Sequence, residues 1–106
     1  MAIKTTYTIK LLPSAKRDLF EITAKIATDK PQTALKYMEK LRLKLSMLSF
    51  HPYMGRLSED SYLKSKRYRV LVLDNYLAFY ILTKRTVKIR RILHGSRDMA
   101  SVVFDK

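Results

Sequence analysis

Cysteine is absent from the 106 residues of this chain, and glycine occurs only twice, at Gly55 and Gly95. Without cysteine the chain can form neither a disulfide framework nor a thiolate metal site. This absence suits a reducing compartment, so we expect a cytoplasmic protein. Two widely separated glycines also exclude the glycine-rich loop that cradles phosphate in many nucleotide-binding enzymes.

Histidine and the carboxylates are scarce as well. The two histidines, His51 and His94, are too few for a zinc site when no cysteine can help them. Only three acidic residues lie beyond residue 60, which argues against a two-metal nuclease. No serine stands in the strand-and-turn setting of an acyl-enzyme nucleophile. We therefore expect neither a metal nor a cofactor.

No apolar run approaches the length needed to cross a bilayer, and the N-terminal residues MAIKTTYTIKLL lack the apolar core of a signal peptide. An apolar content of 47% with 10% aromatic residues indicates a compact folded chain rather than a disordered one. The length fits one domain over residues 1–106, and not two. We expect a soluble protein without a membrane partner.

Positive charge is abundant. Lysine and arginine number 22 against nine acidic residues, which gives a net charge of +13, and residues 61–106 hold eleven of the basic residues and three of the acidic ones. Such self-repulsion is usually tolerated because a polyanionic partner, a nucleic acid or an acidic protein, offsets it. A solvated basic surface that only aids solubility is the alternative.

The first half of the sequence has the pattern of one strand and two helices. Alternating apolar residues predict a strand over residues 6–12, ended by Pro13. Ser14 is a suitable N-cap for a helix that we expect to end near Thr28. A second helix is expected from about Pro31 to Leu48, because its apolar residues keep the 4-3-4-3 spacing of two packed helices.

The second half has the pattern of a loop over residues 49–66 and three strands over 67–73, 76–82 and 87–93. Asn75 is expected to take the positive φ of the tight turn between the first two strands. The run Arg90-Arg91-Ile92-Leu93 breaks the alternation of the last strand and predicts a β-bulge. The expected fold is α+β with the order β-α-α-β-β-β, an antiparallel-rich sheet packed against an N-terminal helical hairpin.

Two kinds of chemistry remain, which are metal-free cleavage of RNA and binding without catalysis. Cleavage through the RNA 2′-OH needs proton transfer and cations that stabilise charge on phosphorus. His94, His51, Glu59 and tyrosine side chains could supply proton transfer, although a lone histidine at a strand end is more often structural. Tyr76, Phe79 and Tyr80 could stack on bases, but at strand spacing they are better explained as core.

Four segments resemble the RelE/ParE toxins of bacterial type II toxin–antitoxin systems. They are SAKRDL at 14–19, the Pro52 to Arg56 region with Gly55, NYLAFY at 75–80 and RILHGSRD at 91–98. The resemblance extends over residues 7–98 with the elements in matching order. The ILHGSRD ending is typical of the ParE-like, plasmid-stabilisation branch.

This resemblance implies a growth-inhibiting toxin that an acidic or amphipathic antitoxin neutralises by wrapping its surface. RelE-like members cleave mRNA in the ribosomal A site with lysines and arginines, whereas ParE-like members act on DNA gyrase. His94 and Arg97 would be catalytic if the chain is RelE-like. The expected residues for binding nucleic acid or the target are Lys64, Lys66, Arg67, Arg69, Arg90, Arg91 and Arg97.

The chain departs from the RelE pattern at several positions. Leu77 follows Tyr76 where RelE-like toxins have arginine, and Val103 or Phe104 stands where their tyrosine is expected. ParE-like poisoning of gyrase is therefore the leading hypothesis. The alternatives are a RelE-like ribosome-dependent endoribonuclease and a non-toxic basic nucleic-acid-binding module. A homodimer or a toxin–antitoxin hetero-oligomer would be compatible with each toxin hypothesis.

Overall fold

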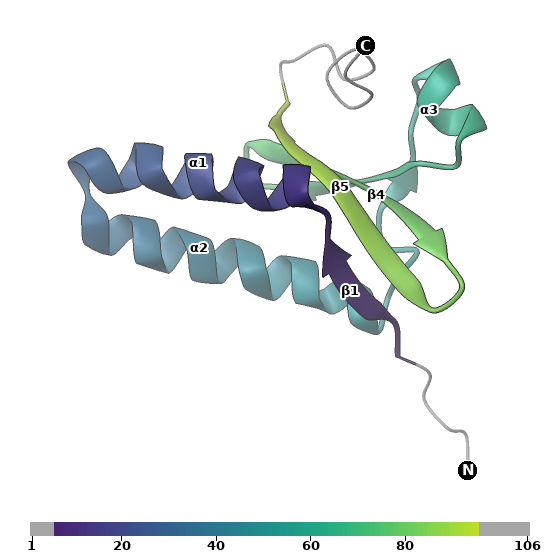
Figure 1. The fold of residues 1–106 in the computed structure, drawn as a ribbon, viewed down its shortest axis with the longest axis horizontal. Coiled ribbons are helices and arrows are strands. Elements are labelled where there is room, and N and C mark those ends of the chain that lie inside the picture. Colours follow the sequence, from purple (N-terminus) through teal and green to yellow (C-terminus); the bar gives the residue numbers. More distant parts are fainter. Residues whose placement is uncertain (1–5, 96–106) are drawn as a thin grey trace.

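The computed structural model describes residues 6–95, which form a five-stranded sheet covered on one face by two long helices (Figure 1). The α+β class and the predicted order of the main elements are confirmed. Two short elements, β2 (Arg56–Leu57) and α3 (Ser61–Ser65), lie within residues 49–66, which were predicted to form a loop. In chain order the elements are β1 Thr8–Leu11, α1 Pro13–Asp29, α2 Pro31–Ser46, a 3₁₀ turn Met47–Ser49, β2 Arg56–Leu57, α3 Ser61–Ser65, β3 Arg69–Leu73, β4 Tyr76–Thr83 and β5 Thr86–His94.

The strands lie in the order β1-β5-β4-β3-β2, with β1 parallel to β5 and all other pairs antiparallel. The basic last strand is therefore inside the sheet and not at its edge. β1 pairs only with the first part of β5, from Thr86 to Ile89. The rest of β5 extends past the end of β1, which leaves a stretch of backbone that needs other partners.

The two long helices run side by side as a hairpin and are joined by a single residue, Lys30 (Figure 1). The prediction that Ser14 caps the first helix is wrong, since the helix begins at Pro13 and Leu12 is its N-cap without a side-chain hydrogen bond. Proline suits the first helical position because its φ is already helical and its missing N–H would be unpaired there. Pro31 begins α2 in the same way.

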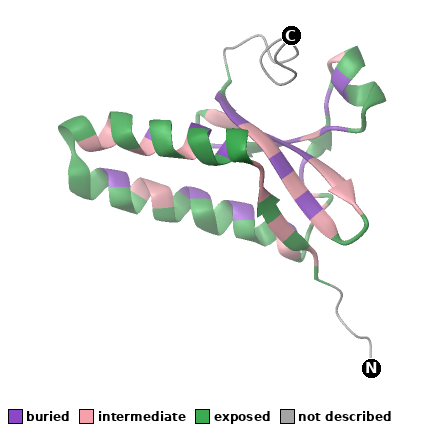
Figure 2. Ribbon diagram, viewed as in Figure 1, coloured by how far each residue is buried: buried purple, intermediate pink, exposed green. Residues whose placement is uncertain are grey.

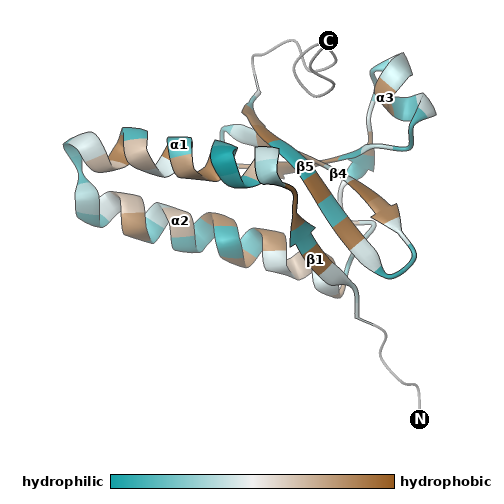
Figure 3. Ribbon diagram, viewed as in Figure 1, coloured by the Kyte–Doolittle hydropathy of each residue, from teal (hydrophilic) through white to brown (hydrophobic). Residues whose placement is uncertain are grey.

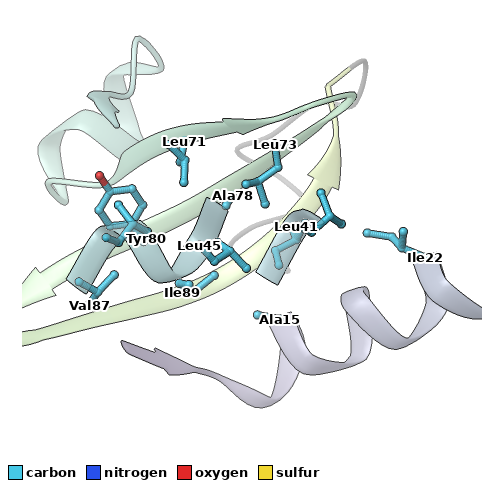
Figure 4. Close-up of a cluster of buried hydrophobic side chains, with 12 residues drawn as sticks. Ala15, Ile22, Leu41, Leu45, Leu71, Leu73, Ala78, Tyr80, Val87 and Ile89 are labelled. Atoms are coloured by element: carbon cyan, nitrogen blue, oxygen red, sulfur yellow. The ribbon is translucent and has the colours of Figure 1, made fainter. Parts of the chain in front are cut away.

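The main hydrophobic core lies between this hairpin and the sheet. Figure 4 shows Ala15 and Ile22 of α1 beside Leu41 and Leu45 of α2. Both pairs lie against side chains of the sheet, namely Leu71, Leu73, Ala78, Tyr80, Val87 and Ile89. Buried residues recur along β5 and at intervals along both long helices (Figure 2). The apolar seam predicted for the second helix is thus confirmed at Leu41 and Leu45.

A smaller cluster lies on the opposite face of the sheet, where α3 contributes Leu63. Its other buried members are Tyr68, Val70, Phe79 and Leu93. Burial on both faces explains why β4 is apolar at consecutive positions, as the sequence indicated. The expectation that Phe79 and Tyr80 are core residues is confirmed.

The turn between β3 and β4 and the last strand match the predictions from the sequence only in part. In the turn between β3 and β4 the positive φ belongs to Asp74, at 59°, and not to Asn75, so that detail of the prediction is wrong. The predicted bulge is confirmed, because Phe79 pairs with Arg91 and Tyr80 with Ile89, which leaves Arg90 as the extra residue. Apolar and polar residues otherwise alternate along β5 (Figure 3). Within residues 6–95, none of the helices is both long and apolar enough to cross a membrane.

Candidate functional site

Three of the predicted cations line one groove beside the sheet. Lys64 at the end of α3, Arg67 in the turn that follows and Arg69 at the start of β3 surround a concavity of about 380 Å³. Its other lining residues are Tyr53, Leu57 and Leu82. We call this concavity the cationic groove. Its mixture of positive charge, one aromatic ring and aliphatic surface suits a phosphate-bearing ligand.

The short helix α3 and the turn after it place Lys64 and Arg67 on this groove. Asp60 caps α3, since its Oδ1 accepts a hydrogen bond of 3.0 Å from the Leu63 backbone N–H. Leu63 is fully buried and fixes the helix against the sheet. Arg67 has a φ of 65°, a left-handed conformation that redirects the chain into β3. The predicted strand over 67–73 therefore begins two residues later.

Arg69 fixes the loop on the other side of the groove. Its Nε donates to the carbonyl of Gly55 over 2.8 Å and its Nη2 to the carbonyl of Tyr53 over 3.3 Å. Its guanidinium also lies 5.1 Å from the centroid of the Tyr53 ring, a cation–π arrangement. Arg69 therefore holds the loop of Tyr53 and Gly55 in place, while its positive charge still contributes to the groove.

Tyr80 supports the same loop from the buried side. Its hydroxyl donates to the carbonyl of Pro52 over 2.8 Å and accepts from the Gly55 backbone N–H over 2.9 Å. Burial raises the pKa of the Tyr80 phenol, which keeps the hydroxyl protonated and able to donate. Sequence reasoning assigned Tyr80 to the core but missed this role. The sequence feature that could have indicated this role is a tyrosine inside an otherwise apolar strand, because a buried hydroxyl needs hydrogen-bond partners.

Among the described residues, the other predicted cations, Lys66, Arg90 and Arg91, do not line this groove. The Nζ of Lys66 lies 5.7 Å from the centroid of the Tyr62 ring, and Lys66 does not line the cationic groove. Arg90 is the half-buried bulge residue of β5. Arg97 lies outside the described residues, so its predicted role stays a prediction.

Arg91 is bound to the first helix. Its Nε lies 2.7 Å from Oδ2 of Asp18 and its Nη2 lies 3.0 Å from Oδ1. Asp18 is 8% exposed, and its Oδ2 also accepts a hydrogen bond of 2.9 Å from the Ile92 backbone N–H. The carboxylate thus pairs with the part of β5 that extends past β1. Arg91 therefore links β5 to α1, and its predicted role in binding nucleic acid or the target stays a prediction.

His94 is distant from the cationic groove. It pairs with Tyr76 at the end of β5, whereas Arg69 pairs with Tyr80, four residues further along β4. At a rise of about 3.3 Å per residue, the two positions are separated by roughly 13 Å along the sheet. The His94 ring instead meets the Tyr76 ring edge-on, with centroids 5.6 Å apart and planes at 85°. The other histidine, His51, lines a neighbouring concavity that shares Tyr53 with the cationic groove.

Within residues 6–95, no three histidine, cysteine, aspartate or glutamate side chains gather where they could hold a metal ion. His94 shares a different concavity, with Lys25 and Arg91, and does not line the cationic groove. This arrangement can bind anionic groups in the cationic groove. Neither His51 nor His94 lines that groove.

The described surface also contains a larger, mainly apolar groove of about 520 Å³ between β1 and the helical hairpin. Leu35 of α2 is largely exposed there, and Ile9 and Leu11 belong to the edge strand β1. Exposed apolar grooves of this kind commonly contact other proteins.

Comparison with known families gives a match over residues 9–99 to the family described as the ParE toxin of the type II toxin–antitoxin system, parDE. The chain belongs to the ParE toxin family. The resemblance inferred from the sequence is confirmed, and the protein is a toxin of the RelE/ParE type from a type II toxin–antitoxin system. Comparison with curated proteins gives no match.

Two solved structures show the same fold as this ParE family toxin. One is from the chromosomal ParDE toxin–antitoxin system of Pseudomonas aeruginosa, with a TM-score of 0.71 and 22% identity over 84% of this chain and 96% of that chain. The other is from the RelBE2 toxin–antitoxin complex of Mycobacterium tuberculosis, with a TM-score of 0.58 and 20% identity over 85% of this chain and 99% of that chain. At these identities the likeness concerns the fold alone.

Proposed function

We propose that this ParE family toxin arrests growth by poisoning DNA gyrase and that a cognate antitoxin neutralises it. The observation that carries the proposal is the separation of His94 from the cations of the cationic groove. Metal-free RNA cleavage needs proton-transfer groups within hydrogen-bond reach of the reacting phosphate. His94 lies roughly 13 Å along the sheet from Arg69, by the spacing of residues in a strand.

The salt bridge between Arg91 and Asp18 supports the same proposal. Both of its nitrogens that face Asp18 are hydrogen-bonded, and the carboxylate neutralises its charge. It is poorly placed to stabilise a developing charge on phosphorus, because that would require it to leave a buried carboxylate. The cationic groove is then best explained as a surface for binding an anionic target, such as a complex of gyrase with DNA.

The proposed antitoxin partner follows from the family and from charge. Both related structures come from toxin–antitoxin systems, ParDE in one case and RelBE2 in the other. A net charge of +13 favours a partner with acidic segments. The genomic expectation is a short open reading frame for an acidic protein beside this one.

A second candidate function is ribosome-dependent cleavage of mRNA. The observation that favours it is the composition of the cationic groove, where Lys64, Arg67 and Arg69 surround the exposed Tyr53. An aromatic ring among cations can stack on a base while the cations bind phosphates. Arg97 would then complete the site, as the RelE-like hypothesis requires. The match to the ParE toxin family argues against the third expectation, a non-toxic nucleic-acid-binding module, which has only the net charge in its favour.

Expression of the toxin alone tests these proposals. The gyrase proposal expects growth arrest with cleaved gyrase–DNA complexes and intact mRNA. Codon-phased mRNA cuts that disappear in Arg97→Ala would establish the nuclease instead. Normal growth on expression of folded protein would leave only the non-toxic binding module.

Two matched double variants test whether gyrase poisoning depends on the cationic groove. Lys64→Ala with Arg67→Ala removes two exposed cations that line it, and Lys16→Ala with Arg17→Ala removes two exposed cations from α1. We expect the first pair to weaken gyrase poisoning at least roughly tenfold, as loss of specific charged contacts does, and the second to leave it nearly unchanged. Equal effects would mean that only net charge matters.

A further inference from the structure

A second apolar groove, of about 300 Å³, lies between α2 and β3. Leu43 of α2, Met47 of the 3₁₀ turn and Val72 of β3 line it and are 53%, 45% and 54% exposed. Single exposed hydrophobic side chains are normal on protein surfaces, but three in one concavity indicate a contact surface. We call it the α2–β3 groove.

The strand that borders this groove has an uncovered outer edge. β2 pairs only with Arg69 and Val70, so within residues 6–95 no strand covers the outer edge of β3 from Leu71 to Leu73. An exposed edge beside apolar side chains can accept a segment of another chain. The groove therefore offers both aliphatic contacts and strand backbone to a partner.

The charges around the groove define the chemistry of that partner. Lys40 and Lys44 line it and lie one helical turn apart, where like charges repel each other. Among the described lining residues only Asp74 is acidic, and its Oδ2 accepts a hydrogen bond of 2.9 Å from the Tyr37 hydroxyl. A carboxylate-bearing partner would offset the repulsion between the lysines. A second copy of this chain would instead bring a further net charge of +13.

We propose that the α2–β3 groove docks an acidic amphipathic segment of the cognate antitoxin. Aliphatic side chains of that segment contact Leu43, Met47 and Val72, and its carboxylates contact Lys40 and Lys44. This inference rests on the proposed toxin–antitoxin function and adds the surface and the chemistry of the contact. It also separates neutralisation from toxicity, since the cationic groove has a different set of lining residues.

The test uses the acidic protein encoded beside this chain, co-expressed with the toxin and also purified for titration. One variant reverses the groove charge, Lys40→Glu with Lys44→Glu, and another places a charge on its apolar wall, Leu43→Asp. We expect both variants to remain toxic, to bind the antitoxin at least roughly tenfold more weakly and to escape its neutralisation. Salt should weaken the wild-type complex more than the complex of the charge-reversed variant.

Matched controls lie on α1. Lys16→Glu with Lys25→Glu makes the same change of net charge on another helix, and Phe20→Asp places a charge on a similarly exposed apolar residue. We expect these variants to be neutralised like the wild type. Circular dichroism and a urea titration establish that all variants are folded.

Each other result overturns the proposal in a distinct way. Wild-type affinity in both groove variants shows that the antitoxin binds elsewhere. Loss of toxicity in folded groove variants assigns the groove to the target. A wild-type dimer that the groove variants dissociate assigns it to a second copy. If the toxin arrests growth and the adjoining protein neither binds nor rescues it, the proposed antitoxin pairing fails together with the docking site.

Discussion

Asp18 and Arg91 join the first helix to the last strand across 73 residues of sequence. The Arg91 guanidinium holds both carboxylate oxygens, at 2.7 and 3.0 Å, and the Ile92 backbone N–H donates to one of them. β1 ends before it can pair with this part of β5, so the carboxylate supplies the acceptor that a longer strand would provide. The pair thus fixes α1 against the sheet at the bulge.

Removal of the Asp18 carboxylate should therefore be costly. Asp18→Ala leaves a half-buried guanidinium without its counter-charge and the Ile92 N–H without its acceptor. We expect the free energy of unfolding to fall by about 2 to 3 kcal/mol. A urea titration followed by circular dichroism measures the change.

An exposed ion pair on the neighbouring helix provides the control. Glu39 and Arg42 form a salt bridge on the solvent side of α2. Water and salt screen such a pair, so Glu39→Ala should leave the urea midpoint almost unchanged. Similar losses in Asp18→Ala and Glu39→Ala would show that burial does not strengthen the first pair.

The Tyr80 hydroxyl is the next point where one atom supports a distant segment. Tyr80→Phe keeps the ring in the core but leaves the Gly55 N–H and the Pro52 carbonyl without their partner. We expect a loss of about 2 kcal/mol in the free energy of unfolding, typical of an unpaired buried polar group. Tyr53→Phe, at an exposed ring, should change the urea midpoint little. Equal midpoints for the wild type and Tyr80→Phe would contradict the support role.

Gly55 occupies a place where no larger residue fits. A Cβ at this position would lie 2.7 Å from both the Tyr80 hydroxyl oxygen and the Val70 carbonyl oxygen. Gly55→Ala should therefore force the loop away from the sheet, at a cost of about 3 kcal/mol. The same loop presents Tyr53 to the cationic groove, so target binding should weaken as well.

Gly95 provides the matched comparison. Its added Cβ would lie 3.8 Å from the nearest atom, the Asn75 carbonyl oxygen, an ordinary contact. Gly95→Ala should shift the free energy of unfolding by less than about 0.5 kcal/mol. A thermal melt of the two variants side by side distinguishes them, and similar melts would refute the steric argument.

The sequence predicted features that depend on local patterns. The bulge at Arg90 followed from the broken alternation around it, and the seam of α2 followed from the spacing of Leu41 and Leu45. Leu12 as the helix cap was missed because Ser14 is the better side-chain cap, whereas Pro13 favours the first helical position and moves the helix start forward. The helix α3, with five residues, is too short to show a helical period.

The site was harder to predict because it depends on contacts between distant residues. Lys64, Arg67 and Arg69 are close in sequence, so their gathering in one groove could be anticipated. The separation of His94 from Arg69 follows from the register of β4 with both neighbours, which no local pattern contains. Asp18 lies in the first half of α1, and nothing nearby in the sequence indicates that Arg91 would reach it.

The hydrogen bond between the Tyr37 hydroxyl and Asp74 makes the free energy of unfolding depend on pH in the alkaline range. Removal from water, and then the neighbouring carboxylate that accepts the bond, raise the pKa of Tyr37 from 10.0 to about 12. Between these two values the unfolded chain has lost the phenolic proton while the folded chain keeps it, so stability falls as pH rises. Lysines titrate in the same range, so the informative quantity is the difference between the wild type and Tyr37→Phe. We expect urea midpoints to fall less steeply in Tyr37→Phe from pH 10 to 12. Parallel curves would show that the Tyr37–Asp74 bond does not form in solution.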